Sequence, residues 1–122
     1  MGWPFSSGWP AAIEPEVRQL VPLAHAPETL DFIGRFHAEL GHPDDGLPFA
    51  RRAVEADPTC WACLDTLALL TFEHGDAGEA VRLQERAIGM LPERVTNAGM
   101  TERLTRYRKA LADPERPVRR PR

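Results

Sequence analysis

The sequence predicts an all-α fold built from antiparallel helix pairs, and three observations point to it. Residues 27–60 align with residues 61–94 without a gap, at an offset of 34 residues. In both segments apolar residues recur every three or four positions, the spacing that places them on one face of a helix. Glycine and proline fall at matching positions, where a helix would end. Such a repeat indicates similar units stacked on one another.

Seven positions match between the two copies, and most of them are apolar or small. The pairs are Leu30 with Leu64, Ile33 with Leu67, Gly41 with Gly75, Gly46 with Ala80, Ala53 with Ala87, Val54 with Ile88, and Pro58 with Pro92. Leucine and isoleucine suit a buried helix face, whereas glycine and alanine let a second helix approach closely. Each copy therefore predicts two helices that pack against each other.

Two segments precede the repeats. Residues 1–12 contain the repeated tripeptide Gly-Trp-Pro and show neither a helical nor a strand period, so we expect a flexible arm. Residues 13–26 carry Ile13, Val17, Leu20 and Val21 at helical spacing, which predicts a short front helix that ends near Pro22.

The first copy, residues 27–60, predicts one helix up to Gly41 and a second up to Pro58. Asp44 or Asp45 is expected to cap the second helix, because a carboxylate accepts hydrogen bonds from the free amides of the first turn. Pro48 would then lie in that first turn, where its missing N–H removes no intrahelical bond.

The second copy, residues 61–94, follows the same plan. A helix is expected before Gly75, which is free to adopt a positive φ. Asp76 is expected to cap the next helix, whose buried face would carry Ala80, Leu83 and Ala87. Pro92 follows the end of that helix.

Residues 95–112 predict a C-terminal capping helix, and residues 113–122 a basic tail that we expect to be disordered. Met100, Leu104, Tyr107 and Leu111 form one apolar face, and the other faces carry arginine and lysine. A terminal helix with a polar outer face suits the end of a repeat array. The tail holds three prolines, which a helix would not accommodate.

This pattern resembles the tetratricopeptide repeat family over residues 27–94. The spacing, the turn glycine and the terminal proline agree, whereas Leu30 and Leu64 stand where the family usually has tryptophan, and His37 and Thr71 replace a later aromatic residue. The resemblance implies a right-handed superhelix and a non-enzymatic function, the binding of a protein or peptide in a concave groove. Two repeats are few for such an array, so the chain could also self-associate through an uncapped end.

In the geometry of that family, the first helix of each pair lines the groove. Helical spacing then places eight residues there: Glu28, Asp31, Arg35, Glu39, Asp65, Leu69, Phe72 and Glu73. This set is mostly acidic, so a basic or apolar segment is the expected partner. The competing interpretation is that these charges form an ordinary solvated face.

The charges are unevenly distributed along the 122 residues, which carry a net charge of −3. Residues 1–93 hold 6 arginines against 15 acidic residues, and residues 94–122 hold 9 basic against 3 acidic residues. An acidic body argues against nucleic acid as a partner. No apolar run is long enough to span a membrane, and no secretory signal is recognisable, so we expect no membrane insertion and a cytoplasmic location. With 14 arginines to one lysine, the composition suggests a bacterial source.

Cys60 and Cys63 form a C-x-x-C motif at the expected start of a helix, and three interpretations remain open. A helix N-terminus stabilises a thiolate, which suits a redox dithiol. A zinc half-site is a second alternative, although no histidine has matching spacing. We favour the third, in which both are small packing residues, and we expect no disulfide to staple the fold.

No other chemistry is recognisable in the sequence. Phosphate-binding loops, serine nucleophile elbows and zinc-protease motifs are missing. Glu73, His74 and Asp76 combine acid and base groups, but they fall at an expected turn, where polar residues are common. We therefore expect no catalytic residue, no cofactor and no metal. A remaining alternative is that the chain is an accessory segment of a larger bacterial membrane enzyme.

Overall fold

The computed structural model describes residues 26–113, and within that range it contains five α-helices and no strand. Their bounds are α2, Pro27–Glu39; α3, Pro43–Ala56; α4, Trp61–His74; α5, Ala77–Gly89; and α6, Ala98–Ala112. The predicted all-α fold is confirmed. The predicted arm, nearly all of the front helix and the tail beyond Asp113 lie outside the described residues.

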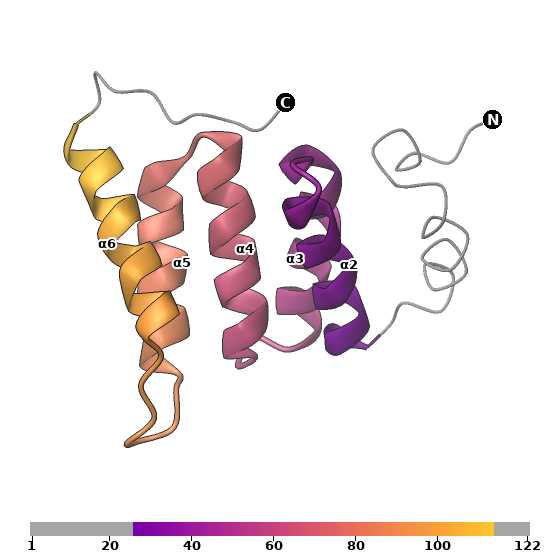
Figure 1. Ribbon diagram of the computed structural model, residues 1–122. Helices are drawn as coiled ribbons and strands as arrows, with labels where there is room; N and C mark the ends of the chain where they lie inside the picture. The colour runs from indigo at the N-terminus through magenta and orange to yellow at the C-terminus, as the bar shows by residue number, and fades with distance from the viewer. Residues whose placement is uncertain (1–25, 114–122) are drawn as a thin grey trace.

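The helices stand side by side in chain order, with α4 in the middle of the stack (Figure 1). Each helix packs against the next, as short connections between antiparallel helices require. In addition, α2 contacts α4 and α4 contacts α6. Helices α2, α4 and α6 therefore form one row, and α3 and α5 form a second layer against it. This arrangement fits a helical repeat, whereas the right-handed superhelix stays a prediction.

The turn within each pair follows from a glycine. Gly41 has φ 78° and Gly75 has φ 111°, conformations that a residue with a Cβ adopts only with strain. Directly after Gly75, the Asp76 carboxylate accepts a hydrogen bond of 3.0 Å from the Glu79 amide at the start of α5. The predicted stop of α4 and the predicted cap of α5 are both confirmed.

The predicted start of α3 was wrong. This helix begins at Pro43 with His42 as N-cap, no side chain caps it, and Asp44 and Asp45 lie in its first turn. Pro48 consequently lies deeper in the helix than the first turn, where its ring nitrogen cannot donate to the carbonyl four residues earlier. Proline at the first helical position explains the early start, because its fixed φ already suits a helix.

Close backbone approach holds α2 against α3. A Cβ added at Gly46 would lie 2.7 Å from the Gly34 carbonyl oxygen, so only glycine fits at this crossing. Around it, Leu30, Ile33, Phe49 and other residues form one apolar cluster.

A second and larger cluster surrounds α4 and reaches α6 through Met100 and Tyr107, both fully buried. These contacts attach α6 to the second helix pair, whereas its role as the cap of the stack stays a prediction. Of the predicted apolar face of α6, only Leu111 is exposed, at 51%.

Candidate partner-binding surface

Asp65 is the centre of a polar network in the row formed by α2, α4 and α6. It is only 5% exposed. Its carboxylate accepts hydrogen bonds from the Arg103 guanidinium at 2.8 to 3.1 Å and from the Gln84 side-chain amide at 2.9 Å. From α2, the Arg35 guanidinium lies 3.5 Å from the Asp65 carboxylate. The expectation that Asp65 offers a free negative charge to a partner is therefore wrong, because two arginines already neutralise it.

Thr66 extends this network toward α2. Its hydroxyl accepts a hydrogen bond of 2.7 Å from Arg35 and is also hydrogen-bonded to the carboxyl group of Asp31. Burial raises the pKa of Asp31, an effect that the Thr66 hydrogen bond and the Arg35 charge oppose. The Oδ1 atom of Asp31 is buried and has no hydrogen-bond donor among the described residues. Within residues 26–113, one acceptor oxygen of Asp31 thus has no partner.

Next to this network, residues of α4 and α6 line an open hollow of about 470 Å³, which we call the α4–α6 hollow. It is lined by Leu69, Glu73, Gly99, Glu102, Arg103 and Arg106. Leu69 and Glu73 were predicted to line the groove, and the structure brings them together there. The four residues from α6 were not predicted as site residues. The sequence contained a signal for these four residues, because positions 99, 102, 103 and 106 are spaced so that they share one face of a helix.

Glu73 is half-buried in this hollow. Its Oε1 atom is buried and has no hydrogen-bond donor among the described residues. Burial raises the pKa of Glu73, and the nearby positive charge of Arg106 partly opposes that shift. A carboxylate that has lost water without gaining a donor is energetically unsatisfied. Glu73 can therefore accept a hydrogen bond from an incoming group.

Arg106 lies over the aromatic rings beneath the hollow. Its guanidinium carbon is 5.2 Å from the centre of the Phe72 ring and 5.6 Å from that of Tyr107. The two rings stack at 4.5 Å, and Phe72 is only 8% exposed. The expected place of Phe72 on the groove surface was thus wrong: its ring belongs to the core, and Arg106 covers it.

The remaining predicted groove residues lie apart from the hollow. Glu28 is in the first turn of α2 and Glu39 is its last residue, and both are exposed. Neither takes part in an ion pair that the structure describes. They provide surface charge at the two ends of α2, but they do not converge on one site.

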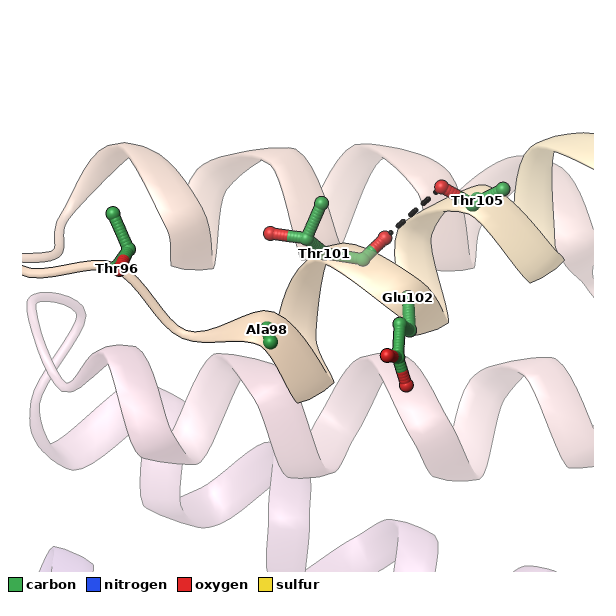
Figure 2. A pocket seen from close by; sticks show the side chains of 5 residues that line it. All are labelled: Thr96, Ala98, Thr101, Glu102 and Thr105. Carbon is green, nitrogen blue, oxygen red and sulfur yellow. Dashed lines mark hydrogen bonds between the residues drawn. The ribbon is translucent and has the colours of Figure 1, made fainter.

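A second hollow, of about 430 Å³, lies on the open side of α6 and is lined by Thr96, Ala98, Thr101, Glu102 and Thr105. Thr101 and Thr105 lie along one side of the helix, and Glu102 extends from the other (Figure 2). The two threonine hydroxyls donate to the backbone carbonyls of Asn97 and Thr101. Because these groups are exposed and bonded to their own helix, this hollow offers no convergent polar site.

The acid and base groups at the turn after α4 have separate partners. His74 Nδ1 lies 2.6 Å from the Asp44 carboxylate, and both residues are exposed. Asp76 instead caps α5. Within residues 26–113, no three histidine, cysteine, aspartate or glutamate side chains are grouped so that they could hold a metal ion.

Cys60 and Cys63 are joined in a disulfide. The interpretation that both act only as small packing residues is therefore incomplete, although Cys63 does pack in the cluster formed with Leu30 and Ile33. The bond closes only one turn of chain and does not connect different helices. It is therefore no staple of the fold, which agrees with that part of the expectation.

No helix among the described residues is long and apolar enough to cross a membrane. Comparison of the chain with family models, with curated proteins and with solved structures found no match. The resemblance to the tetratricopeptide repeat family consequently stays a prediction that rests on the repeat itself.

Proposed function

We propose that this protein is a non-enzymatic interaction module that binds a polypeptide segment along the row formed by α2, α4 and α6, with the α4–α6 hollow as its centre. The observation that carries this proposal is Glu73, which lines a hollow of about 470 Å³ and whose buried Oε1 atom has no hydrogen-bond donor among residues 26–113. A partner that donates a hydrogen bond there would satisfy a group that residues 26–113 leave unsatisfied.

The chemistry of the surface favours a segment with a basic residue next to an apolar one. Glu73 and Asp31 each have a buried acceptor oxygen without a donor in the described part of the chain, and Leu69 provides apolar area between α4 and α6. A lysine or arginine of the partner would donate to Glu73, and a neighbouring apolar side chain would pack on Leu69. Charge-assisted hydrogen bonds of this kind are stronger than neutral ones and orient the partner.

The two arginines of the hollow already have partners within the protein, so we do not expect them to recruit an acidic segment. Arg103 is already committed to Asp65, and Arg106 is held over Phe72 and Tyr107. Moving either would remove charge compensation or ring coverage from the interior. The partner is therefore expected to bind without displacing them.

Selection from a random peptide display library tests this proposal. Peptides that bind the full chain should be enriched in lysine or arginine beside an apolar residue. Glu73→Gln should weaken their binding by about tenfold, the equivalent of roughly 1.4 kcal/mol, because the charge that the partner pairs with is lost. Leu69→Arg should abolish binding, because it places a charge in the apolar part of the hollow.

Glu55→Gln is the matched control, because Glu55 is exposed on α3, away from the row. It makes the same chemical change and should leave binding unaltered. Circular dichroism of each variant checks that the helices remain. Enrichment of acidic peptides, or equal binding by the wild type and Glu73→Gln, would contradict the proposal.

A further inference from the structure

The disulfide at the start of α4 has an asymmetry that the binding function does not use. Cys60 is the N-cap of α4 and is partly exposed, whereas Cys63 lies in the first turn and is 0% exposed. Cys60 is therefore the more accessible of the two to a thiolate from solution, although it also packs against the cluster of α2, α3 and α4 residues that buries Cys63. We propose that Cys60 and Cys63 form a reversible thiol–disulfide exchange site, with Cys60 as the attacked sulfur.

The position of Cys60 favours its release as a thiolate. The Cys63 amide donates a hydrogen bond of 3.1 Å to the Cys60 sulfur, which thereby acts as the cap of the helix. An amide donor and the helix N-terminus both stabilise negative charge at this place. A thiolate formed on Cys60 would thus keep the hydrogen bond that the disulfide sulfur accepts and would interact with it more strongly.

A possible hydrogen-bond acceptor lies near the buried sulfur of Cys63. Cys63 Sγ lies 4.0 Å from the carbonyl oxygen of Pro27, the first residue of α2. A disulfide sulfur has no hydrogen to donate, whereas the thiol produced by reduction could donate to that oxygen. The thiol of the reduced state would therefore have a weak acceptor within reach.

The surrounding turn is ordered by contacts that do not involve the disulfide. Asp57 accepts hydrogen bonds from the amide and the hydroxyl of Thr59 through its side chain, and its carbonyl accepts one from the Cys60 amide. The Leu64 amide donates to the Cys60 carbonyl and begins the helical ladder. Because the bond bridges a separation of only three residues, opening it frees little additional chain. The site can change its oxidation state while the fold persists.

The reaction is a two-electron exchange with a cysteine thiol. A thiolate attacks Cys60 Sγ, the bond between the two cysteines breaks, and Cys63 leaves as a thiolate that takes up a proton. The resulting mixed disulfide on Cys60 is then attacked by a second thiolate, which releases Cys60. Two thiols are oxidised to one disulfide, and the protein disulfide is reduced to two thiols. The reductant is either a small thiol or a protein dithiol, which supply the same chemistry.

Trapping of the mixed disulfide tests which sulfur reacts. The variant Cys63→Ser, incubated with glutathione disulfide, should acquire one glutathione on Cys60. The matched variant Cys60→Ser should react at Cys63 at least about tenfold more slowly, because that sulfur is shielded. Mass spectrometry measures both rates, and Cys63→Ala replaces Cys63→Ser if circular dichroism shows that serine disturbs the fold. Equal rates, or faster reaction at Cys63, would overturn the proposal.

Reduction of the wild-type chain tests reversibility and identifies the reductant. The oxidised protein is incubated with reduced glutathione or with reduced thioredoxin at equal thiol concentration, and the free thiols are alkylated and counted by mass. We expect two thiols to appear with at least one reductant and to disappear again with glutathione disulfide, while the helical signal stays constant. The faster reductant shows whether a small thiol or a protein dithiol is preferred. Resistance to both, or loss of helicity on reduction, would contradict an exchange site.

Discussion

The two helix pairs share one sequence pattern but are held together differently. In the first pair, α2 and α3 meet through the close approach of Gly34 and Gly46. In the second pair, α4 lies between neighbours on both sides and buries nine residues, including the acidic Asp65, whereas α2 buries five. A helix in the middle of a stack has neighbouring helices on both sides and exposes only part of its surface to water. A polar residue that is buried on such a helix, such as Asp65, must therefore find its partners on other helices.

Asp65 gives the largest expected effect and tests this difference directly. Asp65→Ala should lower the free energy of unfolding by about 3 to 4 kcal/mol, because it leaves Arg103 and Gln84 without their buried acceptor. Glu85→Ala is the matched control, since Glu85 pairs with Arg108 at the surface, and it should change stability by less than about 1 kcal/mol. Urea denaturation measures both. Equal losses would mean that Asp65 is no anchor of the row.

His37 on α2 should make the first pair sensitive to acid. Burial lowers the pKa of His37 from 6.5 to about 4, assisted by the charge of His42. The folded state therefore binds this proton more weakly than the unfolded state, so stability is complete above pH 6.5 and declines as the pH falls toward 4. We expect a decline of about 2 to 3 kcal/mol across that range.

The variant His37→Gln isolates this contribution, because glutamine does not titrate. Burial raises the pKa of Asp31 and of Glu73, so both groups favour the folded state at low pH and oppose the histidine effect in the wild type. The difference in unfolding free energy between wild type and variant removes their contribution. If the difference in unfolding free energy stayed constant between pH 7 and pH 4, folding would not lower the pKa of His37, and the prediction would be wrong.

Replacing glycine by alanine should have smaller effects on stability, of opposite sign at Gly46 and Gly89. Gly46→Ala should destabilise the chain by about 1 to 2 kcal/mol, because its Cβ would meet the Gly34 carbonyl, which is backbone and cannot easily move. Gly89→Ala, at the end of α5, meets nothing within 4 Å and should stabilise by up to about 1 kcal/mol. Thermal denaturation compares the two. A stabilising Gly46→Ala would mean that α2 and α3 lie further apart.

The smallest effect concerns the helix caps. Asp76→Ala should lower stability by about 1 kcal/mol, because the Glu79 amide loses its acceptor. The corresponding change in the first pair, His42→Ala, should alter stability by only a few tenths of a kcal/mol, since the His42 side chain does not cap α3. Chemical denaturation of both variants checks this contrast. Similar losses would indicate that His42 contributes a contact comparable to a cap.

Local patterns predicted most of the fold, whereas the site depended on pairs that lie far apart in the sequence. Gly41, Gly75 and Asp76 act within their own turns, so their roles were predictable. Asp65 was predicted to lie on the open surface. Helical spacing shows on which face of its own helix a residue lies, but not which residues of other helices cover that face. Arg103, 38 residues later, covers it. Phe72 was misplaced for the same reason, because Tyr107 and Arg106 reach it from α6. The predicted start of α3 was wrong for a local reason. The helix begins at Pro43, so the two aspartates that were expected to precede it lie in its first turn.

The central claim is that the hollow between α4 and α6 binds a basic segment of a partner. Chemical-shift mapping by NMR tests it most directly, using a peptide from the display selection and the labelled full chain. We predict that the largest shifts occur at Leu69, Glu73 and Gly99, which line the hollow, and that Glu73→Gln needs about tenfold more peptide to reach the same shifts. Shifts confined to α3 and α5, or shifts unchanged by that substitution, would contradict the account.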